Sequence, residues 1–277
     1  MKWLWRIAAT LVAMGPVAAS GQTPIPVTVT GNEASGRIEL PDGGGADLTI
    51  SFEQVVGLNP AALDVTASIV NPHDLVFLDR LPAGGNVSVP AAFPVTLRIQ
   101  PSEASALSFA GVVVVTLHTE NLSFKTNSPL ALYAGPADGP LQDVTRAVGM
   151  GSYRAGGSKG GFSDFMIVAD LRAIDVIVTE KFNRAQGLLN DFGGFMPAAV
   201  LADLQARLDN ARTLYTTGAT LAAKAEIGAF ADAVKTQSGG AIPDVWRAHD
   251  DRINVAGLLR AAADTLKFSL DKKATYS

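Results

Sequence analysis

The stretch "DFMIVADLRAIDVIVTEKFNRAQGLLNDF", residues 164–192, contains a change of hydrophobic spacing that decides the fold. Up to Leu171 the apolar residues form a short, nearly continuous segment with the length of a strand. Beyond it, five residues recur at intervals of four, three, four and three: Val178, Phe182, Ala185, Leu189 and Phe192. These intervals place them on one face of a helix. The change near Arg172 therefore predicts β structure before this residue and α structure after it.

Short strands are predicted throughout residues 24–172. Apolar residues alternate with others in "ADLTISFEQV" and in "AFPVTLRIQP", as expected for strands with one buried face. Turn sequences such as "PDGGGAD", "PAGGN" and "AGPADGP" separate these segments, and no helical crossover pattern lies between them. The pattern predicts an antiparallel β-sandwich, immunoglobulin-like or related.

Four helices are predicted in residues 175–273. The second is expected to begin near Pro197, the third to end at residues 238–240, and the fourth to begin at Pro243. Short connections favour antiparallel neighbours, so the helices are expected to form a small up-and-down bundle. The predicted fold is thus two-domain, all-β followed by all-α, with a short connection that allows the domains to pack on each other.

The first residues, "MKWLWRIAATLVAMGPVAAS", read as a secretory signal peptide covering residues 1–19. A membrane anchor is the alternative, but the uninterrupted apolar core is shorter than the roughly 20 residues that span a bilayer. Cleavage removes Lys2 and Arg6 and no acid, which changes the net charge from −4 to −6. We expect an exported protein, periplasmic or extracellular, soluble after cleavage and without stable membrane insertion. An acidic chain without basic clusters is a poor candidate for nucleic acid.

The absence of cysteine from the chain excludes disulfides and thiolate chemistry. The glycine-rich residues 151–161 resemble a phosphate-binding loop only superficially, because Lys159 is followed by glycine where Ser or Thr is required. A strand-like segment also follows, where a phosphate loop would lead into a helix. We therefore expect Lys159 on an exposed flexible turn, and residues 162–171 as the final strand of the sandwich.

No catalytic, cofactor or metal site is predicted. His118 and Glu120 share one side of a strand because their spacing is two, and His73 could join them around a metal, but the close spacing of a metal motif is missing. A hydrolase is the weaker alternative to a non-enzyme. It requires His118 or His73 within hydrogen-bonding reach of a serine and a carboxylate.

A glycan-binding or adhesin module is the other alternative, and it requires an exposed aromatic groove near Tyr133 or Tyr153. Trp246 and His249 lie in the predicted fourth helix, where Trp246 is expected to anchor the bundle or the domain interface. The weak candidates for a ligand or interface surface are His118, Glu120, Tyr133, Tyr153, Trp246 and His249.

Residues 45–172 resemble a family of uncharacterised exported bacterial proteins, through "FEQVVGLNPAALDVTASIV", "SFAGVVVVTLHTENL" and "GSYRAGGSKGGFSDFMIVADLR". This resemblance implies no activity and no site residues. The helical part looks like the FIMAH-type modules at the ends of exported enzymes and adhesins, which implies an accessory or interaction role. The matching residues are core and turn positions: Leu204, Leu208, Ala211, Gly218, Leu221, Ala222, Phe230, Val234 and Gly239.

Together these patterns favour an exported, non-catalytic binding or structural protein of the cell envelope or extracellular space. Its expected partner is an unidentified envelope protein or glycan.

Overall fold

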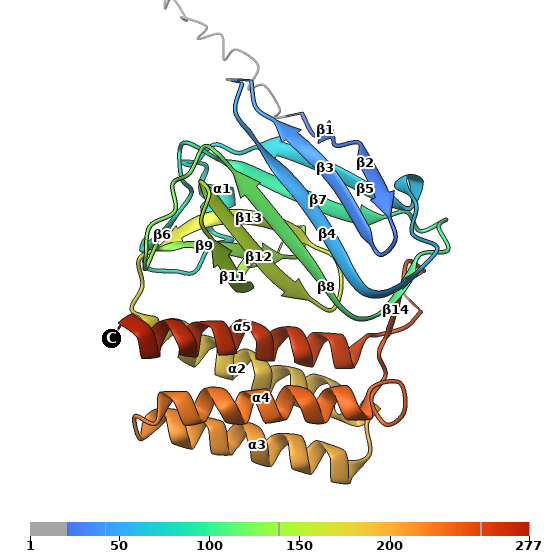
Figure 1. Cartoon of the computed structure of the whole chain (residues 1–277), viewed down its shortest axis with the longest axis vertical. Coiled ribbons are helices and arrows are strands. Elements are labelled where there is room, and N and C mark those ends of the chain that lie inside the picture. The colour runs from blue at the N-terminus through green and yellow to red at the C-terminus, as the bar shows by residue number, and fades with distance from the viewer. Residues whose placement is uncertain (1–20, 42, 138, 250, 277) are drawn as a thin grey trace, which may run out of the picture.

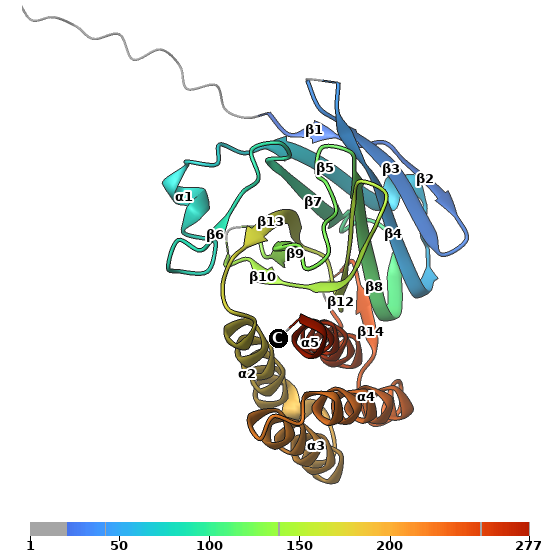
Figure 2. The same ribbon diagram turned by 60° about the vertical axis from the view of Figure 1, so that its left-hand side comes forward.

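The computed structural model describes residues 21–41, 43–137, 139–249 and 251–276. Two antiparallel sheets face each other, and the long helices lie together on one side of them (Figures 1 and 2). The predicted signal peptide, residues 1–19, lies outside the described residues. Within the described ranges, no helix combines the length and the apolar character needed to cross a membrane.

In the described part of the chain, fourteen strands form the two sheets. The first sheet has the order β1 (Thr23–Pro24), β5 (Leu63–Ile69), β7 (Val95–Pro101), β13 (Asp164–Asp170), β9 (Leu130–Gly135) and β10 (Gln142–Asp143), and β6 (Val87–Ser88) pairs with β13. The second sheet has the order β11 (Thr145–Gly149), β12 (Tyr153–Lys159), β8 (Ser108–Thr119), β4 (Gly45–Val56), β3 (Glu33–Glu39) and β2 (Val27–Thr30), and β14 (Val245–Arg247) pairs with β8.

The alternation seen in the sequence marks the face of each strand that is buried in the sandwich. Leu48, Ile50 and Phe52 of β4 are buried, and the corresponding residues of β7 join them in one apolar cluster: Val95, Leu97 and Ile99. The sequence prediction of an antiparallel, β-rich arrangement is therefore confirmed. β13 is the last strand before the helices, although β14 joins the sandwich after them.

The helices are α1 (Leu75–Leu78), α2 (Ile174–Phe192), α3 (Ala198–Thr216), α4 (Thr220–Gln237) and α5 (Val255–Tyr276), with 3₁₀ turns at Pro60–Ala62 and Gly193–Phe195. The short α1 lies in the part predicted to be all β. Val178, Phe182, Ala185 and Leu189 of α2 are buried in one apolar cluster with residues of the other three long helices. The apolar face predicted for α2 is thus the face that packs on its helical neighbours.

The predicted start of the fourth helix at Pro243 is wrong, because residues 245–247 form β14 and α5 begins only at Val255. β12 pairs with β8 only from Val113 onward, so the edge of β8 at Ser108–Ala110 is left open. β14 pairs with this edge, and Trp246 stacks on Phe109 with ring centroids 5.3 Å apart. Pairing with a distant strand edge therefore overrides helix formation here.

α5 is buried on several faces because it lies between the second sheet and the other helices (Figure 2). The approach to the sheet is close: a Cβ on Gly257 would lie 2.3 Å from Gly111 O, and one on Gly160 would lie 2.5 Å from Leu258 N. The chain is therefore not an all-β part followed by a separate all-α part. That residues 24–172 and 175–273 fold as independent domains stays a prediction.

Candidate functional site

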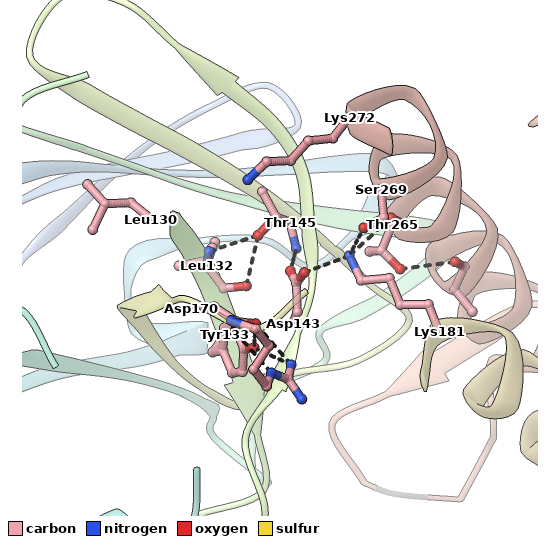
Figure 3. A network of polar contacts seen from close by, with 12 residues as sticks. Leu130, Leu132, Tyr133, Asp143, Thr145, Asp170, Lys181, Thr265, Ser269 and Lys272 are labelled. Carbon is pink, nitrogen blue, oxygen red and sulfur yellow. Dashed lines mark hydrogen bonds and ion pairs between the residues drawn. The ribbon is translucent and has the colours of Figure 1, made fainter. Parts of the chain in front are cut away.

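A buried ion pair joins the sandwich to the helices at the point where β10, α2 and α5 meet (Figure 3). Lys181 Nζ of α2 lies 2.7 Å from Asp143 Oδ2 and donates hydrogen bonds to Ser269 Oγ at 2.8 Å and Thr265 O at 3.1 Å. An ammonium group has three protons, so each one has an acceptor. Burial lowers the pKa of Lys181, and the carboxylate of Asp143 opposes this shift. The pair fixes α2 and α5 to the sandwich.

A second polar network fixes the start of α2. Arg172 donates two hydrogen bonds to Asp170, at 3.0 and 2.9 Å, and one to the hydroxyl of Tyr133 at 3.0 Å. It also forms an ion pair with Glu180 of α2 at 2.7 Å. Although burial alone would raise it, hydrogen bonds from Arg172 and Tyr133 lower the pKa of Asp170. The residue expected to connect strand and helix therefore also holds them together.

A cleft of about 630 Å³ lies between α2 and the segment that contains β10. One face of α2 forms a wall, because residues spaced by four, three, four and three line the cleft: Ile177, Lys181, Arg184, Leu188 and Asp191. Apolar side chains form much of the opposite wall: Leu81, Pro82, Pro140 and Leu141. The volume is within the range of small-molecule sites, roughly 300–1,000 Å³.

Most charged groups that line the cleft have partners. Arg80 pairs with Asp164, Asp143 with Lys181, and Glu180 with Arg172, while Asp191 is exposed to solvent. Arg184 differs: within the described part of the chain, its Nη1 is buried and has no hydrogen-bond partner. A buried polar group without a partner is costly, so this guanidinium is the unusual feature of the cleft.

Lys159 lies close to Arg184 rather than on the exposed flexible turn that the sequence predicted. It is the last residue of β12 and is half-buried. Ser158 N donates to Val144 O, so the backbone next to Lys159 lies close to the end of β10, although Lys159 is not among the residues that line the cleft. Burial, together with the positive charge of Arg184, lowers the pKa of Lys159 to about 7. The turn prediction failed because β12 extends to the point where Gly160 meets α5.

The structure does not bring the candidate histidines together. His118, near the end of β8, donates from Nε2 to Gly151 O at 2.6 Å, and its Nδ1 lies 3.6 Å from Asp47. Glu120 is exposed just after β8, and His73 is exposed just before α1. In the portion that the structure describes, no three His, Cys, Asp or Glu side chains are grouped so that they could hold a metal ion.

Tyr133 and Tyr153 do not line the exposed aromatic groove that was expected near them, because both side chains are fully buried. Each hydroxyl has an internal acceptor, Asp170 Oδ2 at 2.6 Å for Tyr133 and Leu130 O at 2.7 Å for Tyr153. Buried tyrosines commonly satisfy their hydroxyls in this way.

Trp246 and His249 flank the sandwich rather than a helix. Trp246 is half-buried against Phe109 and Phe162, and it fixes β14 to the sandwich. His249 is exposed just beyond β14. Trp246 was expected on a helix as an anchor of the bundle or the domain interface; its ring instead contacts residues of the sandwich, and its role at the interface stays a prediction.

Sequence reasoning missed the residues of the cleft. Lys181 and Arg184 are three residues apart on α2 and lie beside the apolar face that packs on the other helices. A pair of cations on the helix face next to an apolar stripe is normally solvated, so the sequence did not indicate that these two side chains line a cleft. Only the fold brings Lys159 and Asp143 to the same place.

No curated protein and no solved structure matched the chain. One family model did match, and it spans residues 8–274, well beyond the residues 45–172 that carried the resemblance in the sequence. Its description is a family of unknown function (DUF6689), and the match includes both the sheets and the helices. The chain therefore belongs to DUF6689, a family of unknown function.

Proposed function

We propose that this chain is a non-catalytic binding protein that acts outside the cytoplasm, and that the cleft between α2 and β10 is its binding site. The observation that carries this proposal is the buried Arg184 Nη1, which has no hydrogen-bond partner among the described residues and belongs to a residue that lines a cleft of about 630 Å³. Small-molecule sites combine apolar walls with a few polar groups that orient the ligand, and this cleft has both.

Binding is favoured over hydrolysis because His118, although it has a carboxylate neighbour, is not hydrogen-bonded to a serine in the described part of the chain. Its Nδ1 lies 3.6 Å from Asp47, and its Nε2 donates to Gly151 O. Asp143, the buried carboxylate of the cleft, already accepts from Lys181 and from Thr145 N. The burial of Tyr133 and Tyr153 removes the support for a glycan platform.

We also propose that the protein is exported and that its helices have an interaction role. The charged and apolar pattern of residues 1–19 supports export through a cleaved signal peptide. The core and turn positions shared with FIMAH-type modules support an interaction role for the helices. Production of the full-length chain in a bacterial host, followed by mass spectrometry, tests export: the mature protein is expected in the envelope or medium and to begin at Ser20.

The binding site can be tested by filling the cleft. Gly187 lines it, and a Cβ at this helical position would meet no atom within 4 Å, so Gly187→Phe is expected to fold and to occupy the space. Gly228→Phe is the matched control, since Gly228 of α4 is equally open and lies away from the cleft. Each protein is exposed to a small-molecule extract of cell envelopes and examined by native mass spectrometry.

We expect an added mass on the wild type and on Gly228→Phe, and its loss from Gly187→Phe. The molecule released on denaturation should be chemically unchanged. No added mass on the wild type, or an added mass that Gly187→Phe retains, contradicts the proposed site. Conversion of the molecule that stops on His118→Ala would favour an enzyme instead.

A further inference from the structure

The charged residues that line the cleft balance in number, with Arg80, Lys181 and Arg184 against Asp143, Glu180 and Asp191, but they are not all paired with one another. Lys181, Arg184 and Lys272 all lie near enough to Asp143 for its charge to act on them, and Lys159 lies near Arg184. Lys181 takes Asp143 as its partner, and Lys272 donates to Ser128 O at 2.8 Å. Neither Lys159 nor Arg184 has a carboxylate partner among the described residues. Arg184 is therefore a cation of the cleft wall without a carboxylate of its own among the described residues, and Lys159 is a second such cation close to it.

An unpaired guanidinium with a buried nitrogen destabilises a fold unless a ligand pairs with it. Arg184 offers the planar donor fork that binds carboxylate or phosphate oxygens in pairs, and Lys159 adds an ammonium donor. Neither cation takes part in the polar networks that fix α2 and α5. Their position is explained if an anion completes the site.

The remainder of the cleft indicates what the anion is attached to. Its walls are mainly apolar side chains from two sides: Leu81, Pro82, Pro140, Leu141, Ile177 and Leu188. A volume of about 630 Å³ exceeds what an inorganic anion needs, and apolar walls favour a hydrocarbon part of the ligand.

We propose that the cleft binds the carboxylate or phosphate group of a small organic anion at Arg184, with Lys159 of β12 as a neighbouring positive charge, while the apolar body of the anion lies against the apolar walls. This proposal rests on the proposed function, because it assumes that the cleft is a binding site, and it adds the chemical class of the ligand.

Calorimetric titration of the full purified protein tests the charge requirement. The probes are octanoate, octyl phosphate, octanol and inorganic phosphate. We expect one or both of the charged octyl probes to bind, and octanol and inorganic phosphate to bind at least tenfold more weakly. A preference between octanoate and octyl phosphate identifies the anionic group.

Variants test the assigned residues. Arg184→Gln and Lys159→Met are expected to weaken binding of the favoured octyl anion by roughly tenfold to a hundredfold, the range for loss of a charge-assisted hydrogen bond. Arg154→Gln removes an exposed cation from the same strand as Lys159 and should leave the affinity unchanged. Arg184→Gln should also leave the melting temperature of the ligand-free protein unchanged or raise it, because the removed charge has no partner.

Three results would overturn the assignment: equal binding of octanol and the anions, no effect of Arg184→Gln, or no binding of any octyl probe. If Arg184→Gln fails to fold by circular dichroism, Arg184→Lys serves in its place, since it keeps the charge and removes the fork. If Gly187→Phe still displaces an envelope molecule while these anions fail to bind, the cleft binds a ligand of another class and only the anion proposal is wrong.

Discussion

Lys181 is 4% exposed, and its ammonium group is held by acceptors from both the sandwich and α5. Such a residue connects two parts of the fold. Removing its partner lowers the free energy of unfolding strongly, because the remaining group is then left charged and buried. Lys159 and Arg184 lie close by but lack such partners. The contrast between a cation with a carboxylate partner and two cations without one among the described residues separates structural residues from candidate binding residues.

Asp143→Ala is expected to lower the free energy of unfolding by about 3–5 kcal/mol, because it leaves the ammonium of Lys181 buried and unpaired. Urea denaturation monitored by circular dichroism measures the change. Asp203→Ala is the control, since Asp203 forms an exposed ion pair with Arg207 on α3, and such pairs contribute roughly 0–1 kcal/mol. Equal, small losses for both variants would show that the buried pair does not support the fold.

Lys159→Met is expected to stabilise the protein most at low pH. The folded-state pKa of about 7 lies below the ordinary value of 10.5, so below pH 7 the side chain is charged in both states and its burial destabilises the fold fully. The stability advantage of the variant, on the order of a few kcal/mol at pH 6, should therefore shrink by up to about 1.4 kcal/mol per pH unit between pH 7 and 9.

Denaturant unfolding at several pH values, for the wild type, Lys159→Met and Lys125→Met, measures this difference. Lys125 is exposed, so its variant should follow the wild type at every pH. A Lys159→Met protein that is less stable than the wild type at pH 6, or one whose difference does not depend on pH, would show that Lys159 is not held in a desolvated site.

At the scale of elements, α5 contacts the second sheet on one side and the other long helices on the other (Figure 1). Small residues allow this position, since Gly257 faces the backbone of Gly111 and Asn254 Nδ2 donates to Gly111 O at 2.6 Å. Gly111 has a φ of +76°, a conformation that glycine adopts without strain. The close approach of α5 to β8 thus depends on glycine in both elements.

Gly257→Ala is expected to destabilise the protein by about 1–3 kcal/mol, because its Cβ would lie 2.3 Å from Gly111 O and the helix would have to move away from the sheet. Gly228→Ala, at an open position in α4, should stabilise it by up to about 1 kcal/mol through higher helix propensity. Thermal unfolding of both variants compares the two effects. Stabilisation by both substitutions would contradict the close contact between α5 and β8.

The sequence predicted those elements whose cause is local. The intervals between Val178 and Leu189 identify the buried face of α2, and the alternation from Leu48 to Phe52 identifies that of β4. β14 could not be predicted, because its partner is an edge of β8 more than a hundred residues earlier in the chain. The burial of Tyr133 likewise depends on Asp170 and Arg172, which reach its hydroxyl only in the folded protein.

The cleft was hidden for the same reason. Arg184 and Lys159 belong to different elements, and each alone resembles an ordinary surface cation in the sequence. Their shared position results from the docking of α2 on the segment that contains β10. A sequence pattern reports periodicity along one element, whereas a binding site of this kind depends on the packing of several.

For the whole molecule, the helices and the sandwich have separate apolar clusters, yet buried polar groups and a strand cross between them. Arg260 of α5 pairs with Glu53 of β4 at 2.7 Å, and Ser158 donates to Asp264 at 3.0 Å. Contacts of this kind couple the stability of the two parts. The predicted boundary near Arg172 therefore marks the change from mainly strands to mainly helices, and we expect the two parts to unfold together.

The sandwich and the helices are expected to unfold as one cooperative unit, because the proposed cleft exists only where the helices are fixed to the sandwich. Differential scanning calorimetry of the full-length protein and of Asp143→Ala tests it most directly. We predict a single transition in the wild type, and in the variant a single transition that is shifted as a whole to lower temperature. Two separate transitions in the wild type, or a shift confined to one of them in the variant, would contradict the claim and would favour independent folding of residues 24–172 and 175–273.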